Sequence, residues 1–381
     1  MEFYVLDNNF LKTETIDNFQ SMVWTERFNT PGDFELVVPA TVDNINQYAP
    51  ETFLSKNESK EIMIIDTQKI KNNQLTLTGS SLMGFLDNRV HGYGYFFGAY
   101  PTFLAPYNDD WAAGYAGLVI KSIMENMLIN NWGPGYGTPD LDDIPNLSTG
   151  PYAYGIDRPG SISLPRGDLL TTITTLAQLD SLGFSIYLDS VTPGGSPPYS
   201  IKFKTYEGLD RTTNQSTNPP IIFSEELGNI EDLEEVRSIK AYKNVCYVQI
   251  PNEIRIARPE ALRLQAYFRV ESEPNPPRLG WQARSMRIAP TDMPAYTTEA
   301  ALINNLTLRG QAALAQTTKQ QLIDGNIIKM PSTLFGVDYS MGDIVEIRSS
   351  YGITHKVRIT EYIWSKNETG EKEYPTFEIV A

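Results

Sequence analysis

Short stretches of alternating apolar and polar residues, separated by turns rich in Gly, Pro and Asn, constrain this 381-residue chain to a β-rich fold. Residues 34–39 follow a turn at Pro31-Gly32-Asp33, and residues 62–70 are separated from residues 75–78 by the polar segment 71–74. Successive side chains of a strand point to opposite faces, so apolar alternation bounded by turn residues is typical of strands and hairpins. A small barrel or a sandwich would close such a set of strands, and we predict that residues 1–92 form a first domain of this kind, a β-barrel.

Three segments instead have the apolar spacing of helices. The first starts at Asp109 or Asp110 and reaches Met127 with apolar residues four apart; the second covers residues 169–177 and is followed by Gly183. Spacing of three and four residues is typical of an amphipathic helix, and Gly is common just after a helix end. The third covers residues 297–324, with Thr297 or Thr298 as its cap.

These patterns give a β-rich α+β fold class, with strand-rich regions at both ends of the chain, an intervening α+β domain and a helix-bearing insertion. The predicted domains are a first barrel at 1–92, an α+β domain at 93–235, a second barrel at 236–254 and 327–381, and an insertion at 255–326 with the long helix 297–324. The alternating segment around Cys246 belongs to the second barrel in this division, with Cys246 as a small core residue. Gly310 should cost the long helix about 1 kcal/mol relative to Ala, so we expect another backbone to pack closely there.

Segments near the two ends of the chain resemble each other. Residues 61–79 and 356–380 both contain an alternating strand, a polar turn with Asn and Lys, and a second alternating strand. We predict that they belong to two copies of one barrel with the same strand order. One joint sheet formed from both end regions would contradict this duplication.

The chain has 46 acidic residues against 31 Lys and Arg, a net charge of −15. Phosphate binding needs Lys and Arg, so the overall charge argues against specific binding of nucleic acid. The charge serves either solubility or an acidic channel that a polyanion passes without sticking. We expect no signal peptide and no membrane span, because no basic n-region and no run of about 18 apolar residues occurs; we expect folding in the cytoplasm.

Residues able to perform catalysis are scarce. The chain has two His and one Cys, and it lacks the phosphate-binding, zinc-protease and nucleophile-elbow motifs. We predict no enzymatic activity, no cofactor and no metal site, with His91 and His355 structural or solvent-exposed. The acidic cluster Asp140, Asp142 and Asp143 is either a solvated loop or a Ca²⁺ site, because it lacks the glycine and distal Glu of an EF-hand loop.

Residues 91–107 are rich in Gly and aromatic residues. We predict a subunit interface there, formed by Tyr93, Tyr95, Phe96, Phe97 and Tyr100. Two alternatives remain open: these side chains cover the chain's own core, or they form a sugar platform in a carbohydrate-binding or carbohydrate-degrading protein.

Several segments, in order, resemble the tail-hub family of long-tailed bacteriophages, the Tal-like and baseplate hub proteins. They are WTERF at 24–28, PGDFELVVP at 31–39, TGSSLMGFLDNR at 78–89, YEGLDRT at 206–212 and VDYSMGDIV at 337–345. The residues of these segments also have structural explanations. Trp24, Phe34, Leu36 and Val38 alternate as a buried face does. Gly32 and Gly342 suit turns, where a positive φ is expected, and Asp210 and Arg211 could pair.

The resemblance implies a fold with two tail-tube-like β-barrels and the α+β domain between them. It also implies a structural hub at the virion tail tip, assembled in the host cytoplasm. Such a homotrimer would adapt the sixfold tail tube to a threefold central fibre or spike and surround the channel for DNA ejection. Its implied partners are copies of itself, the distal tail protein or tail tube, the central fibre or spike, and the tape-measure protein, while DNA passes through without specific binding. A phage-derived injection machine would use an equivalent protein.

Overall fold

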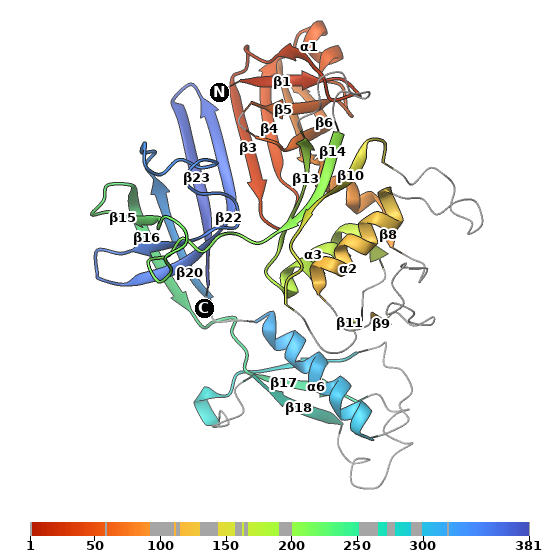
Figure 1. Ribbon diagram of the computed structural model, residues 1–381, viewed down its shortest axis with the longest axis vertical. Coiled ribbons are helices and arrows are strands. Elements are labelled where there is room, and N and C mark those ends of the chain that lie inside the picture. Colours follow the sequence, from red (N-terminus) through yellow and green to blue (C-terminus); the bar gives the residue numbers. More distant parts are fainter. Residues whose placement is uncertain are drawn as a thin grey trace, which may run out of the picture. The chain divides into compact units, whose positions relative to one another are not determined.

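A computed structural model describes the protein at residues 2–57, 59–91, 110–111, 115–129, 144–156, 162–163, 167–189, 200–250, 266–272, 279–290, 299–317 and 320–380 (Figure 1). The fold is β-rich α+β, as the sequence predicts. The chain forms two compact units: unit 1 comprises Met1–Leu233 and Asp324–Ala381, and unit 2 comprises Glu234–Ile323. No helix within the described residues has the length and apolar character needed to cross a membrane.

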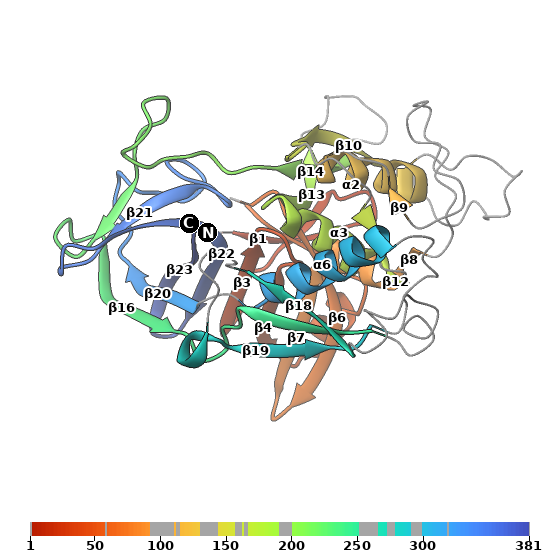
Figure 2. The ribbon, with the colours of Figure 1, turned by 90° about the horizontal axis from the view of Figure 1, so that it is seen from below.

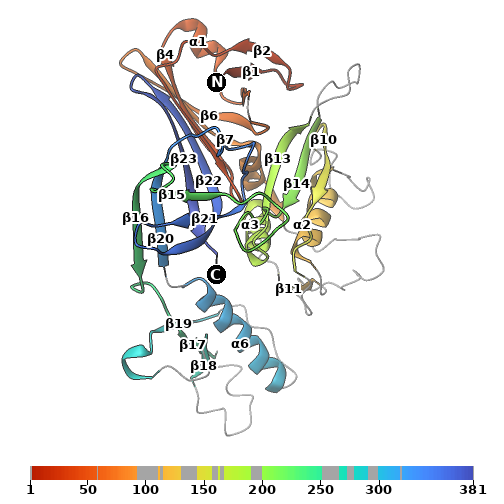
Figure 3. The same cartoon turned by 60° about the vertical axis from the view of Figure 1, so that its left-hand side comes forward.

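One 11-stranded sheet dominates unit 1, in the order β15, β21, β22, β3, β4, β7, β6, β5, β1 and β2, with β23 beside β22. Its strands are β1 (Phe3–Leu6), β2 (Lys12–Thr15), β3 (Ser21–Arg27), β4 (Asp33–Pro39), β5 (Phe53–Lys56), β6 (Ile62–Lys71), β7 (Gln74–Ser81), β15 (Ile222–Ser224), β21 (Ile344–Arg348), β22 (Thr354–Asn367) and β23 (Gly370–Ile379). Figure 1 shows β3 and β4 next to the hairpin of β22 and β23, and Figure 3 shows β4 and the same hairpin from another side. The short helix α1 (Val42–Gln47) follows β4.

The predicted N-terminal strands and hairpin are confirmed. β6 and β7 pair antiparallel, and the turn between them places Asn72 and Asn73 at positive φ, a conformation that Asn tolerates better than most residues. The predicted buried face also holds: Trp24, Phe34, Leu36 and Val38 are each at most 2% exposed. Burial of this apolar row fixes the register, because a slip of one residue would turn the row to the other face.

The two end regions of the chain meet in the long strand β22. Its first part, residues 354–358, pairs with β21, and its second part, residues 361–366, pairs with β3. The end regions therefore form one joint sheet, and the prediction of two separate copies of one barrel is wrong. The two hairpins still share one feature: each has a register shift in its first strand, between Ile65 and Thr67 and between Ile359 and Glu361.

The middle of unit 1 pairs two helices, α2 (Ala116–Met124) and α3 (Leu169–Leu179), with a sheet in the order β10 (Leu147–Tyr152), β14 (Ser200–Tyr206) and β13 (Gly183–Asp189). The β13–β14 hairpin is as predicted. A single-turn π-helix at Glu125–Ile129 continues α2, and a 3₁₀-helix at Leu82–Asn88 follows β7. Figure 2 shows α2 and α3 beside β13 and β14.

Both predicted helix boundaries in this region need correction. Asp110 and Trp111 form β9, paired with β11 (Ile162–Ser163), so the helix starts later, where the Asp180 carboxylate accepts a hydrogen bond from the Ala116 amide. Helix α3 begins where Asp168 caps Thr171 N, but it is Ser181 that has the positive φ after its end. Gly183 is instead the first residue of β13. Glycine is required there for lack of space, because a Cβ would lie 2.4 Å from the Phe28 ring.

Unit 2 contains a three-stranded sheet with one helix against it. The order is β18 (Tyr267–Glu271), β17 (Val245–Gln249) and β19 (Ser285–Ile288); a 3₁₀-helix, η3 (Gly280–Gln282), precedes β19. Helix α6 (Glu299–Ala315) packs on β17 and β18 (Figures 1 and 3). Cys246 is buried in the core between them, as predicted, although its strand belongs to this sheet and was expected in the second barrel.

The prediction that the long helix extends to residue 324 is also wrong. The helix ends at Ala315, Thr317 bonds back to the Leu314 carbonyl, and Gln320–Ile327 forms β20, which pairs with β16 (Ile230–Ser238). β-branched residues such as Thr lose side-chain freedom in a helix, which favours this stop. Close packing at Gly310 is confirmed, but the neighbour is a side chain: a Cβ at Gly310 would lie 2.5 Å from Val270 Cγ2.

Candidate assembly surface

Arg27 links the two end regions on one face of the joint sheet. Its guanidinium lies 2.7 Å from Glu361 of β22 and 2.6 Å from Asp33 of β4, and it donates to the Pro31 carbonyl at 2.8 Å. A guanidinium has a planar fork of donors, so one side chain can hold several acceptors in a fixed arrangement. The Arg27 side chain is 29% exposed, so these contacts are in reach of solvent and of partners.

A buried charged cluster lies beside this seam. Lys56 Nζ is 3.3 Å from Glu26 Oε1, and both side chains are largely buried. Trp24 Nε1 donates to the same Glu26 oxygen, and the Lys56 ammonium lies 5.6 Å from the Tyr362 ring centroid. Buried charges are tolerated when they are paired and hydrogen-bonded, so the cluster fixes β5 against β3.

Glu61 extends this cluster towards the α+β region. It forms an isolated bridge with Tyr187 of β13, and its Oε2 is buried without a hydrogen-bond partner among the described residues. Burial, and then the charge of Glu26, raises the pKa of the Glu61 carboxyl well above its usual range, although Lys56 and Lys204 act in the opposite direction. Burial also lowers the pKa of Lys204, because desolvation disfavours any charged form.

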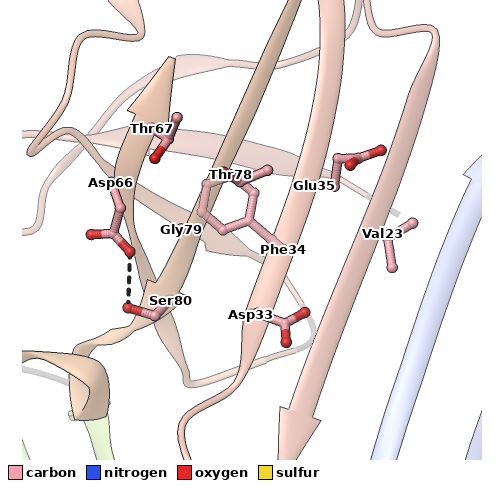
Figure 4. A pocket seen from close by; sticks show the side chains of 9 residues that line it. All are labelled: Val23, Asp33, Phe34, Glu35, Asp66, Thr67, Thr78, Gly79 and Ser80. Atoms are coloured by element: carbon pink, nitrogen blue, oxygen red, sulfur yellow. Dashed lines mark hydrogen bonds between the residues drawn. The ribbon is translucent and has the colours of Figure 1, made fainter. Parts of the chain in front are cut away.

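A shallow hollow of about 530 Å³ opens on the sheet face that carries Arg27 (Figure 4). Its acidic lining residues are Asp33, Glu35 and Asp66, and Thr78 and Gly79 lie between them. Ser80 Oγ donates to Asp66 at 3.1 Å, as Figure 4 shows. A Cβ at Gly79 would lie 1.8 Å from the Ile64 carbonyl, so only Gly fits. The hollow presents hydrogen-bond acceptors, and no set of three His, Cys, Asp or Glu in the described chain is placed to hold a metal.

Asp343 organises a second junction in unit 1. It accepts hydrogen bonds from the amides of Leu209 and Ser340, and its carboxylate lies 2.7 Å from Arg211 Nε. The expected Asp210–Arg211 pair is therefore replaced by a pair with Asp343, while Asp210 accepts from Thr212 N. Gly342 has the expected positive φ of +87°. At position 32 glycine is required for lack of space and not for a positive φ, since a Cβ would lie 2.3 Å from the Thr25 carbonyl.

The predicted interface residues Tyr93, Tyr95, Phe96, Phe97 and Tyr100 lie outside the described residues, and so do Asp140, Asp142 and Asp143. Of the two histidines, His91 lies in the short strand β8 (Val90–His91) and His355 in β22, which belong to different sheets. The structure does not bring them together. What sequence reasoning missed is the cluster of Lys56, Glu26 and Glu61.

The fold is that of phage tail proteins. Over 99% of this chain, it is similar to a tail protein from Neisseria meningitidis, at a TM-score of 0.54 and 13% identity, covering 96% of that protein. It is similar at the same TM-score to the 43 kDa tail protein of prophage MuSo2 from Shewanella oneidensis, at 9% identity, with 99% and 98% of the two chains covered.

Residues 2–377 match the model of the siphovirus ReqiPepy6 Gp37-like proteins, and the chain belongs to this family. None of the curated proteins matches the chain. The resemblance to phage tail proteins that the sequence segments indicate is thereby confirmed. The protein is a structural component of the phage tail or baseplate type.

Proposed function

We propose that this protein is the hub of a phage tail tip, where three copies surround the channel for DNA ejection. The observation that carries the proposal is the whole-length similarity of fold: the chain covers 96% and 98% of two tail proteins. The role we propose is structural, without enzymatic activity.

The joint sheet supports a role in transmitting force. Residues from both end regions share one sheet, and Arg27 ties three of its strands together through Glu361 and Asp33. A hub must transmit force between the tail tube or distal tail protein above and a central fibre or spike below. We propose these partners, together with the tape-measure protein, and a location at the tail tip after assembly in the host cytoplasm.

A pair of bulged hairpins, β6–β7 and β22–β23, supports the proposed change from sixfold to threefold symmetry. Three copies would present six such hairpins to a sixfold tube and one threefold set of subunits to a fibre, within a closed ring. The acidic hollow beside Arg27 would suit a wall past which DNA slides, because like charge prevents sticking.

Two measurements test this function. Light scattering on the purified protein in about 0.15 M salt, where surface charges are moderately screened, should give about 128 kDa, three times 42.8 kDa. Electron microscopy of intact particles should place threefold density for this chain on the tail axis at the tip. A monomer that persists at high concentration would contradict the trimer, and density along the shaft or on the capsid would contradict the hub.

A further inference from the structure

Positive charge is concentrated in unit 2. Residues 234–323 contain 12 Lys and Arg and 8 Asp and Glu, a net charge of +4; since the whole chain carries −15, the remaining residues carry −19. The two units of this acidic chain therefore carry net charges of opposite sign. Complementary potentials steer association and select partners, so the two units of different copies are electrostatically matched.

The sheet of unit 2 has one covered and one open face. Cys246, Val248 and Val270 point into the core with α6. On the other face, Tyr247 in the central strand lies directly between Arg269 of β18 and Arg287 of β19. Tyr247 is 37% exposed, and Tyr267 on the same face is 41% exposed. The open face is thus a row of two arginines around a tyrosine, with a second tyrosine beside it.

The contacts of these arginines leave the face basic. Arg269 lies 2.8 Å from Glu271 on its own strand, and Arg287 stacks 5.8 Å from the Tyr267 ring centroid. No carboxylate in the described part of the chain pairs with Arg287. The stacked guanidinium is held in place while its hydrogen-bond donors stay available.

An exposed tryptophan stands at one end of this sheet. Trp281 of η3 is fully exposed, and Leu279 just before it is 63% exposed. Asn244 anchors this turn to the start of β17, donating to the Gln282 carbonyl and accepting from the Arg284 amide. Trp, Tyr and Arg are the residues that dominate the binding energy of protein interfaces. Their occurrence together favours a protein partner over a polyanion held by charge alone.

We propose that the open face of the unit 2 sheet, Tyr247, Tyr267, Arg269 and Arg287 with Trp281 at its end, docks on the acidic unit 1 of a second copy of this chain. The partner is chosen by charge: unit 1 carries −19, and each copy supplies both surfaces. Such a head-to-tail contact uses two different surfaces, and it forms a ring when the rotation between successive copies closes, as it does in a trimer. The inference rests on the proposed self-assembly and names the surface that drives it.

The test compares two double variants of the full chain with equal charge change. Arg269→Glu with Arg287→Glu reverses the open face, whereas Arg237→Glu with Lys240→Glu reverses two exposed charges elsewhere in the same unit. We expect the face variant to need at least tenfold more protein than wild type to assemble, and the control to change less than threefold. Thermal melting of both variants verifies that they are folded.

A photo-cross-linker at Tyr247 locates the partner surface. Mixing unlabelled and ¹⁵N-labelled protein separates cross-links between copies from those within one copy. Cross-links between copies that reach unit 1 support the proposal; cross-links that stay within one copy, or that join unit 2 to unit 2, overturn it.

The failure of the inference can be told apart from the failure of the proposed function. If wild type and both variants assemble alike, the open face is not the interface, although the trimer stands. If wild type never assembles, the trimer and this inference fail together. If the face variant loses only binding to double-stranded DNA, tested directly on the same samples, the face serves a polyanion and the proposal is overturned.

Discussion

Trp24 of β3 and Trp364 of β22 lie directly opposite each other where the N-terminal and C-terminal parts of the joint sheet meet, and neither side chain is exposed. Phe3 packs against both rings, with centroids 6.0 Å and 5.1 Å away. The core of the first 90 residues is therefore completed by a residue from the last 20.

Replacing Trp364 by Ala should destabilise unit 1 by about 3 to 5 kcal/mol, because it leaves a large cavity in this core. Urea unfolding followed by Trp fluorescence measures the loss. Tyr351, which is 89% exposed, is the matched control, and its replacement by Ala should change stability by less than about 0.5 kcal/mol. Similar midpoints for the two variants would mean that the end regions do not share a core.

Lys56→Met should destabilise the protein by about 3 to 5 kcal/mol, because it leaves the Glu26 carboxylate buried without its cation. Adding Glu26→Gln should recover most of this loss, because the amide oxygen can still accept from Trp24 Nε1. A thermodynamic cycle over the two single variants and the double variant measures the coupling. A double variant less stable than Lys56→Met alone would contradict a paired cluster.

Glu61 should make stability depend on pH. Its pKa is raised in the folded state, so the contribution is fully present below the pKa of the unfolded chain and is lost as pH rises towards the folded pKa. Glu61→Gln should therefore be more stable than wild type at pH 8, by about 1.4 kcal/mol for each unit of raised pKa. The difference should shrink towards pH 4. Urea titrations at several pH values test this, and a difference that grows on acidification would show the opposite sign.

Gly310→Ala should destabilise unit 2 even though Ala favours a helix by about 1 kcal/mol. The new methyl group would lie 2.5 Å from Val270 Cγ2, and overpacking costs about 1 to 3 kcal/mol. Adding Val270→Ala to the variant should relieve the clash and restore the melting temperature in part. If Gly310→Ala alone raises the melting temperature, the helix is not in tight contact with β18.

The sequence predicts the local elements of this fold well where one periodicity dominates. The β6–β7 hairpin is marked by alternation on both sides of an Asn-containing turn, and α3 by its apolar stripe after Asp168. Prediction fails where pairing with a distant segment determines the secondary structure. Asp110 and Trp111 have helical spacing in the sequence, but they form a strand because they pair with β11. The last residues of the predicted long helix became β20 for the same reason, through pairing with β16.

The candidate surface was less accessible to sequence reasoning. Lys56 and Glu61 stand on either side of a turn between two strands, which suggests an exposed hairpin, and only the approach of β3 and β13 buries them. The basic character of unit 2 could have been found by counting charges along the chain. The net charge of the whole chain concealed it.

The divided pairing of β22 sets an order of events during synthesis. The outer partner of β3 lies far along the chain, as the 334 positions between Arg27 and Glu361 illustrate. While a nascent chain leaves the ribosome, β3 therefore has an unpaired edge until residue 366 has emerged, and such edges invite pairing with other chains. Contacts of this sequence separation form slowly. Closure of the sheet by β22 thus delays the finished unit 1 until residue 366 has been made, so shorter chains cannot present a completed unit 1 for assembly.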